Sequence, residues 1–346
     1  MAFDIKHTTQ SAVADAGVSG QIGPSEWNEA HTLTGLLVGP GGRLSLTAAT
    51  PIADASGATT VYYVPFSSRA VPVYNGTEFV YVDISTGLSQ TLADTTKSPA
   101  AAAASKVYDM FVWNDSGTIR CTRGPAWPSS TSRGTGAGSS ELTRTLGFPT
   151  NANAITNGPA ANRGTWVGTI YTNASTQCND NDTDRTVYNA YNKVSRRLYQ
   201  AITEDSWSYN TATWRQIQGT TTYSFNFLRG GMGMDEPVNA IYHVYIQNNT
   251  QAQSGGSTPY IAWGDNSTSS PSAPTTTCGQ LRNYTSVIGF QGGQLHCHWV
   301  GSGSNTVGFN TLSPLERGDS GSTTLTWFGD NGGTLIQSVI NGWARA

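Results

Sequence analysis

Residues 321–337 read GSTTLTWFGDNGGTLIQ, and this stretch decides the fold class of the chain. Apolar and polar side chains alternate in its two halves, as expected of strands with one buried face. The Gly-Asp-Asn-Gly-Gly run between them suits a turn, because glycine and asparagine adopt positive φ angles at low cost. The stretch predicts a strand, a turn and a strand that form a β-hairpin on the surface.

Patterns of the same kind extend through the rest of the chain. Val71–Tyr74 and Thr77–Val82 flank Asn75-Gly76, the preferred two-residue turn of a hairpin. Further strands are expected at 59–65, 107–113, 166–172, 223–228, 240–246, 285–290 and 294–300. Period-two alternation between Gly-rich turns predicts a mainly β chain whose last region is a sandwich or jelly roll.

One segment has helical rather than strand periodicity. Apolar side chains recur at i, i+4, i+7 and i+11, which are Val187, Tyr191, Val194 and Leu198. Acids precede this stripe and bases lie near its end, the arrangement that a helix dipole favours: Asp182 and Asp184, then Lys193, Arg196 and Arg197. The pattern predicts one short amphipathic helix within the C-terminal β-domain.

The composition excludes several classes of protein. Only 12% of the 346 residues are charged and the formal net charge is −3, so no basic nucleic-acid-binding surface is expected. No apolar run approaches the about 18 residues of a membrane-spanning helix. Met1–His7 lacks a basic region followed by an apolar run, so no secretory signal is expected and synthesis is cytoplasmic. Nothing in the sequence indicates a cofactor.

We expect four regions along the chain. Residues 1–40 show little periodicity and cannot bury a core alone, so they form an N-terminal docking segment. Residues 41–127 form a β-domain. Residues 128–165 are rich in Ser, Thr, Gly, Asn and Pro, which makes them linker-like although partly packed. Residues 166–346 form a C-terminal display domain that resembles a β-sandwich or jelly roll.

Two pairs of residues are candidates for binding. Trp27 is the one large apolar group with which the N-terminal segment docks, and His31 follows it closely. Tyr260 and Trp263 sit among small polar residues near the Gly-, Ser- and Thr-rich loop 250–277. Loops carry recognition while strands hold them in place, so this pair contacts either sugar rings or a cell-surface protein. The alternative is that both rings fold back onto the domain.

The candidate catalytic motifs are weak. Gly318-Asp319-Ser320-Gly321 copies the letters around a chymotrypsin-type nucleophile, but the usual histidine context is missing and Ser322 replaces the next glycine. A turn is the simpler interpretation. The Gly-rich run 230–234 lacks the Lys-Ser or Lys-Thr of a phosphate loop. Neighbouring acids such as Asp235 and Glu236 do not by sequence alone define a catalytic pair. No catalytic residue is predicted, and the chain is expected not to be an enzyme.

His296 and His298 are weak candidates for a metal site. On a strand they point to one face and Cys297 to the other. They either share a metal with His243 or with an acid from a neighbouring chain, or form an ordinary satisfied or solvent-facing pair, and no metal is predicted. Cys278 and Cys297 pair only if their strands are neighbours.

Several motifs, in the same order along the chain, carry a resemblance to known proteins. They are Trp27-Asn28-Glu29-Ala30-His31-Thr32-Leu33-Thr34-Gly35, Arg43–Thr47, Ala58–Pro65, Val73–Thr77, Val107–Val112, Gly124–Trp127, Asn153–Gly158, Gly164–Ile170, Tyr188–Arg196 and Trp327–Gly333. From about residue 27 onward the chain resembles tailed-bacteriophage virion structural proteins of the tail fibre, tail tip and head fibre-like kind. Each motif is weak alone, and only their shared order is specific.

The resemblance implies a non-enzymatic tail fibre or spike of the virion, with no catalytic residues to carry over. It would dock by its N-terminus and display a C-terminal β-domain for host attachment. The implied partners are other tail or capsid proteins, two further copies in a homotrimer, and a host cell-surface glycan or protein, without nucleic acid or membrane insertion. A head decoration protein or capsid fibre is the alternative, and a polysaccharide depolymerase is a third.

Overall fold

The computed structural model of the chain describes residues 4–5, 31–32, 38–248, 257–272, 279–280, 291–301, 306–320, 324–330, 332–333 and 337–346. Trp27, Cys278 and the expected strand 285–290 lie outside these residues. The described chain is mainly β, which confirms the predicted fold class, and its single helical element is the 3-10 turn η1 (Ile217–Gly219). No described helix is long and apolar enough to cross a membrane.

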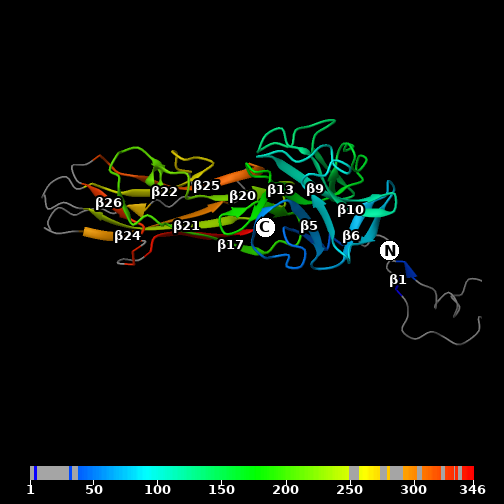
Figure 1. Cartoon of the computed structure of the whole chain (residues 1–346), viewed down its shortest axis with the longest axis horizontal. Helices are drawn as coiled ribbons and strands as arrows, with labels where there is room; N and C mark the ends of the chain where they lie inside the picture. Colours follow the sequence, from blue (N-terminus) through cyan, green and yellow to red (C-terminus); the bar gives the residue numbers. More distant parts are fainter. Residues whose placement is uncertain are drawn as a thin grey trace, which may run out of the picture.

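Two lobes lie end to end in an elongated molecule (Figure 1). Strands such as β5, β9 and β13 build the N-terminal lobe, and strands such as β21, β22 and β25 build the C-terminal lobe. The short pair β1 (Asp4–Ile5) and β2 (His31–Thr32) lies beyond the N-terminal lobe, at the end of the molecule opposite to β26 (Figure 1).

The N-terminal lobe contains two sheets and a hairpin. The six-stranded sheet consists of β9 (Val107–Asp115), β10 (Thr118–Ala126), β11 (Leu142–Thr145), β12 (Phe148–Asn151), β13 (Thr165–Tyr171) and β16 (Val187–Asn189). The smaller elements are the sheet β3 (Gly42–Ser45), β5 (Thr60–Pro65) and β8 (Leu88–Thr91), and the hairpin β6 (Ala70–Tyr74) and β7 (Phe79–Asp83). An apolar core that includes Leu44, Tyr63 and Val112 fills the space between them.

Two sheets face each other in the C-terminal lobe. The first consists of β4 (Ala55–Ala58), β14 (Cys178–Asp180), β15 (Asp184–Arg185), β19 (Arg215–Gln216), β20 (Phe225–Arg229), β22 (Tyr260–Asp265), β23 (Gly279–Gln280) and β25 (Gly308–Arg317). The second consists of β17 (Ser195–Ala201), β18 (Ser206–Ser208), β21 (Val238–Asn248), β24 (Gln291–Gly301), β26 (Leu325–Phe328) and β27 (Val339–Arg345). Their inward side chains, among them Trp263, Trp299 and Trp327, form one core.

The strand pairings cross the region boundaries expected from the sequence. β13 lies beside β9 from Thr165 to Tyr171, and β11 and β12 extend the same sheet. The segment 128–165 is therefore joined by hydrogen bonds to strands on both sides of it in the sequence. β4 pairs with β14, so a strand from the first β-region joins the sheet that continues into the C-terminal lobe, while Ala55, Ala58 and Cys178 pack against the N-terminal core.

The expected hairpins have different details in the structure. Tyr74 pairs with Phe79, so the β6–β7 loop has four residues and the predicted two-residue turn is wrong. The Asn75 side chain stabilises the conformation of this loop, because its Oδ1 accepts hydrogen bonds from the N–H groups of Thr77 and Glu78. In the stretch 321–337 the first strand is confirmed as β26, which pairs with β21 on one edge and β18 on the other. Both edges of β26 are therefore occupied and its Trp327 is buried, so the predicted surface hairpin is wrong. Residues 334–336 of the second strand lie outside the described residues.

The predicted amphipathic helix is wrong, because residues 182–198 contribute to three strands. β17 pairs with β27 over its whole length, from Ser195 to Ala201. Its inward side chains are Arg196 and Leu198, two residues apart as in a strand. Arg196 and Arg185 both contact the buried carboxylate of Asp180, at 2.8 and 3.2 Å. Sheet pairing and these buried ion pairs outweigh the weak preference of an isolated apolar stripe for a helix.

A buried aspartate holds the N-terminal lobe together at β9. Asp109 is 0% exposed, and its carboxylate accepts five hydrogen bonds. Trp166 and Thr169 on β13 donate to Oδ1 at 2.9 and 2.7 Å. Trp127 donates to Oδ2 at 2.9 Å, and Arg133 donates to both oxygens at 2.8 and 3.0 Å. A buried carboxylate needs such partners, so these contacts fix where β13 and the segment after β10 pack.

We predict that Asp109→Asn lowers the free energy of unfolding by about 3–5 kcal/mol, because it leaves the Arg133 guanidinium without its counter-charge. Urea denaturation of the purified variant measures this loss. Asp83→Asn is the matched control: its partner Arg69 lies 4.0 Å away and is 65% exposed, so the expected loss is about 0–1 kcal/mol. Equal losses in the two variants would contradict the role given to Asp109.

Candidate recognition site

An aromatic and basic cluster lies far from the N-terminal lobe, on the outer side of the sheet that holds β22 and β25. At the start of β25, Phe309 stacks on Tyr171 of the N-terminal lobe with ring centroids 4.0 Å apart. Arg317 ends the same strand eight residues later, which is about 26 Å at 3.3 Å per residue. Arg317 therefore lies toward the end of the C-terminal lobe that points away from the junction.

Strand register brings Arg317 against two aromatic rings. Tyr260 is its direct partner in the β22–β25 ladder. The guanidinium carbon of Arg317 lies 5.3 Å from the Tyr260 ring centroid and 5.9 Å from that of Trp214. The two rings are 6.5 Å apart and inclined at 66°. All three side chains are partly exposed, and we call them the distal cluster.

The charge of Arg317 is not neutralised within the part of the chain that the structure describes. No described carboxylate lies within ion-pair distance of it, and its buried Nε has no hydrogen-bond partner there. The indole N–H of Trp214 likewise has no described acceptor. The distal cluster thus offers a cation, ring faces and hydrogen-bond donors to a ligand.

A buried carboxylate, Glu316, forms hydrogen bonds near the end of β25 on the opposite face of the sheet from Arg317. Glu316 is 0% exposed. It accepts hydrogen bonds from Trp207 Nε1 at 2.6 Å, from the Gln218 N–H at 3.1 Å and from Arg215 Nε at 2.8 Å. Arg215 also stacks over Tyr209, 3.6 Å from its ring centroid. Glu316 therefore neutralises Arg215 and leaves Arg317 as the basic group that faces outward beside the two rings.

Tyr260 and Trp263, the pair expected to be displayed, have different positions. Trp263 is 0% exposed, and its Nε1 donates to the Cys297 carbonyl at 3.0 Å. The expectation that Trp263 contacts an external partner is wrong, because residues 260 and 263 point to opposite faces of β22. Tyr260 is partly exposed in the distal cluster and stays a binding candidate.

The histidines of β24 have the predicted alternation. His296 and His298 are exposed, whereas Cys297 is buried. His296 stacks on His243 with centroids 4.5 Å apart, and His298 lies 3.3 Å from the Asn239 Oδ1. Burial lowers the pKa of His243, and His296 lowers it further. Across the described ranges, no three His, Cys, Asp or Glu side chains converge as metal ligands would.

The remaining candidates from the sequence have structural contacts. Ser320 Oγ accepts a hydrogen bond from the Ala212 N–H at 2.9 Å, and Asp319 accepts one from the Thr258 N–H at 2.8 Å. Both therefore tie loops together, as the turn interpretation of this motif expects.

Asp235 Oδ1 accepts hydrogen bonds from the N–H groups of Gly230 and Gly231, so its carboxylate occupies the Gly-rich loop. Of the docking pair, Trp27 lies outside the described residues, and His31 has only its backbone described, paired with Ile5. The possible pairing of Cys297 with Cys278 also lies outside them.

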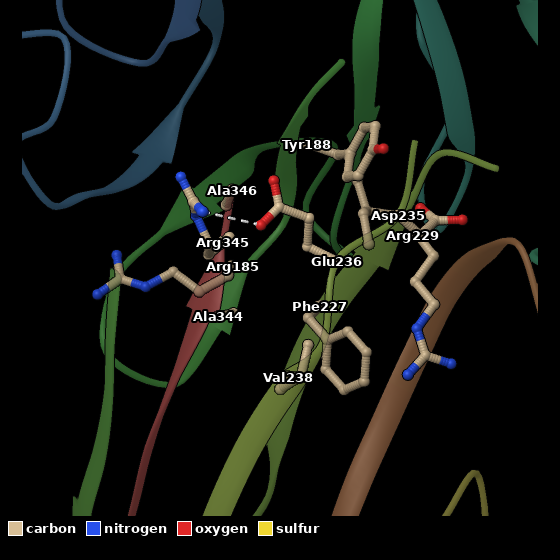
Figure 2. A pocket seen from close by; sticks show the side chains of 11 residues that line it. Arg185, Tyr188, Phe227, Arg229, Asp235, Glu236, Val238, Ala344, Arg345 and Ala346 are labelled. Carbon is tan, nitrogen blue, oxygen red and sulfur yellow. Dashed lines mark ion pairs between the residues drawn. The ribbon is translucent and has the colours of Figure 1, made fainter. Parts of the chain in front are cut away.

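A small cavity lies where the two lobes meet. Figure 2 shows Tyr188, Phe227, Asp235, Glu236 and Arg345 around it, with the Glu236–Arg345 ion pair at 3.1 Å. Its volume of about 10 Å³ is close to the minimum for one water molecule. Burial and the nearby Asp235 raise the pKa of Tyr188, so its hydroxyl stays protonated. The cavity is part of the lobe junction and is too small for an organic ligand.

A wider groove runs between β8 and β10. Its volume is about 520 Å³, and Gln90, Asp94, Lys97 and Arg120 are among its lining residues. Lys97 and Arg120 both contact Asp115, at 2.7 and 2.5 Å, so each of these cations at the groove already has a carboxylate partner. The distal cluster has the more distinctive chemistry, because its arginine is not neutralised.

Comparison with known proteins adds no family assignment: no protein-family model matches the chain, and no curated protein matches it.

The sequence alone could not identify two members of the distal cluster, Trp214 and Arg317. Residues 214 and 317 are far apart in the chain, and the β19–β25 and β22–β25 pairings that bring them to Tyr260 depend on long-range register. The local signal that exists is the run of aromatic and basic residues at 207–215, which contains Trp207, Tyr209, Trp214 and Arg215.

We predict that Glu316 makes stability depend on pH. Burial raises its pKa from 4.5 to about 7, although Trp207 and Arg215 favour the ionised form. The folded state then binds a proton that the unfolded state has released, so stability falls as the pH rises from 4.5 to 7. Glu316→Gln should flatten this decline, measured as the unfolding midpoint in urea at each pH. An unchanged slope would contradict the assignment.

Proposed function

We propose that this chain is a structural protein of a bacteriophage particle, a tail fibre or spike that attaches to the host surface. The observation that carries the proposal is the elongated arrangement of two β-lobes, with β1–β2 at one end and the distal cluster toward the other (Figure 1). Such an arrangement separates a docking end from a recognition end. The ordered motifs of the sequence, which resemble virion structural proteins, support the same role.

The chemistry of the site favours binding over catalysis. Glu316, the carboxylate next to Arg317 in the chain, is fully buried and accepts hydrogen bonds from three residues. A glycosidase needs two carboxylates that reach the substrate from opposite sides. Ser320 Oγ accepts a backbone hydrogen bond in a turn, which supports a structural role for this serine. The proposed role is therefore attachment without hydrolysis.

Deletion of residues 1–35 tests the docking part of the proposal. The truncated chain should keep the circular dichroism and melting temperature of the full chain, because the described cores begin after residue 38. It should be missing from purified particles when it is expressed in infected cells. Quantitative mass spectrometry of the particles measures its copy number.

Ser320→Ala is the matched control for that experiment, since it changes one turn contact and is expected to join particles at the normal level. Normal incorporation of the truncated chain would contradict N-terminal docking. A copy number of the full chain that matches the number of capsomers in the head would contradict the tail assignment and favour a head decoration protein. Absence of the full chain from particles would overturn the proposed function.

We further propose that the chain forms a homotrimer. Long strands such as β24 and half-exposed side chains on the outer face of the second sheet, Tyr199, Ile241 and Trp343, provide faces that subunits cover. Light scattering of the purified chain at micromolar concentration should give three times the mass of one chain. The mass of a single chain under these conditions would contradict a trimer formed by the protein alone.

A further inference from the structure

We propose that the distal cluster of Trp214, Tyr260 and Arg317 binds a carboxylated saccharide. The setting, attachment to a cell surface, rests on the proposed function. The binding chemistry rests on the geometry of the cluster alone and can be tested on the isolated protein.

The charge of Arg317 selects an anionic ligand. Within the described residues its guanidinium has cation–π contacts, at 5.3 and 5.9 Å, but no carboxylate partner. The neighbouring Arg215 differs, because Glu316 accepts its hydrogen bonds at 2.8 Å. The planar guanidinium matches a carboxylate in two parallel hydrogen bonds, which its two Nη groups can donate while the Nε stays buried in the protein.

The two rings select a sugar. Trp214 and Tyr260 are partly exposed and inclined at 66°, so they form a notch instead of a flat platform. The apolar C–H face of a pyranose packs against one such ring while its edge faces the other. The Trp214 N–H is then a donor for a sugar hydroxyl. A pyranose with a carboxylate on its ring would contact the rings and Arg317 together.

An acidic peptide fits the cluster less well. A peptide of glutamates offers carboxylates on flexible stems, which lose conformational freedom on binding and present no rigid apolar face to the rings. An inorganic anion would use Arg317 and leave both rings without a contact. The combination of one cation with two angled rings therefore favours a rigid ring that carries its own carboxylate.

Calorimetric titration of the full chain tests the proposal with matched probes. Oligogalacturonate, oligoglucuronate and sialyllactose are the carboxylated probes, and the methyl ester of oligogalacturonate has the same rings without charge. At least one carboxylated probe should bind, and its affinity should fall as salt is added. The methyl ester of a binding saccharide should bind about tenfold more weakly, because it cannot form the charge-assisted pair.

Variants assign the binding to the cluster. Arg317→Gln should reduce the affinity for the carboxylated probe about tenfold and leave the ester within about twofold, whereas Trp214→Ala should weaken both. Arg69→Gln, at an exposed arginine of the N-terminal lobe, is the matched control and should change neither. Melting temperatures check that each variant is folded. Should Arg317→Gln not fold, the acid and ester pair still tests the charge on the native chain.

Four results would overturn the proposal. The first three are no binding of any carboxylated probe, equal affinity for the acid and its ester, and equal affinity for a hexaglutamate peptide. The fourth is an unchanged affinity of Arg317→Gln, which would show that the probe binds at another surface. These outcomes are distinct from failure of the proposed function. Absence of the chain from particles would contradict the proposed role in a virion, but it would not change the saccharide affinity measured by calorimetry.

Discussion

The buried carboxylate of Asp109 is the constraint on which the N-terminal half of the molecule depends. A charge in the interior is tolerated only when its partners are in place, and here they come from β13 and from the segment after β10. Arg133 extends the network to the C-terminal lobe by donating to the Gly230 carbonyl at 2.6 Å. One carboxylate thereby couples strand register within a sheet to the placement of the second lobe.

A second group of buried charges has the same effect at the lobe junction. Asp180 lies between Arg185 and Arg196, and both arginines also contact Asp54 at 2.7 Å. Burial raises the pKa of Asp180, whereas the two arginines favour its ionised form. These ion pairs connect β15 and β17 to the loop before β4. The lobes are therefore joined by directional contacts, which fix an orientation more narrowly than apolar packing does.

The sequence predicts local features such as strands, but it does not predict contacts that depend on the register between distant strands. Alternation located the strands that became β21 and β24, because their side chains face the core at every second position, whereas β9 is buried at every position from Val107 to Trp113. The helix prediction failed because the apolar spacing at 187–198 also fits strands whose arginines turn inward to Asp180. The sequence assigned Tyr260 and Trp263 the same expected role, but their side chains point to opposite faces of β22 in the structure. Trp214 and Arg317 join Tyr260 only through long-range pairing.

The direction of the long strands has a mechanical consequence. β21 and β25 run along the long axis of the molecule (Figure 1). β21 is bonded on one side to β24 over its whole length and on the other to β27 and then to β26. A pull between the two ends of the molecule would act parallel to these strands, so many ladder hydrogen bonds would share the load in shear. The C-terminal lobe is therefore built to resist tension along its axis better than a force that peels one strand sideways.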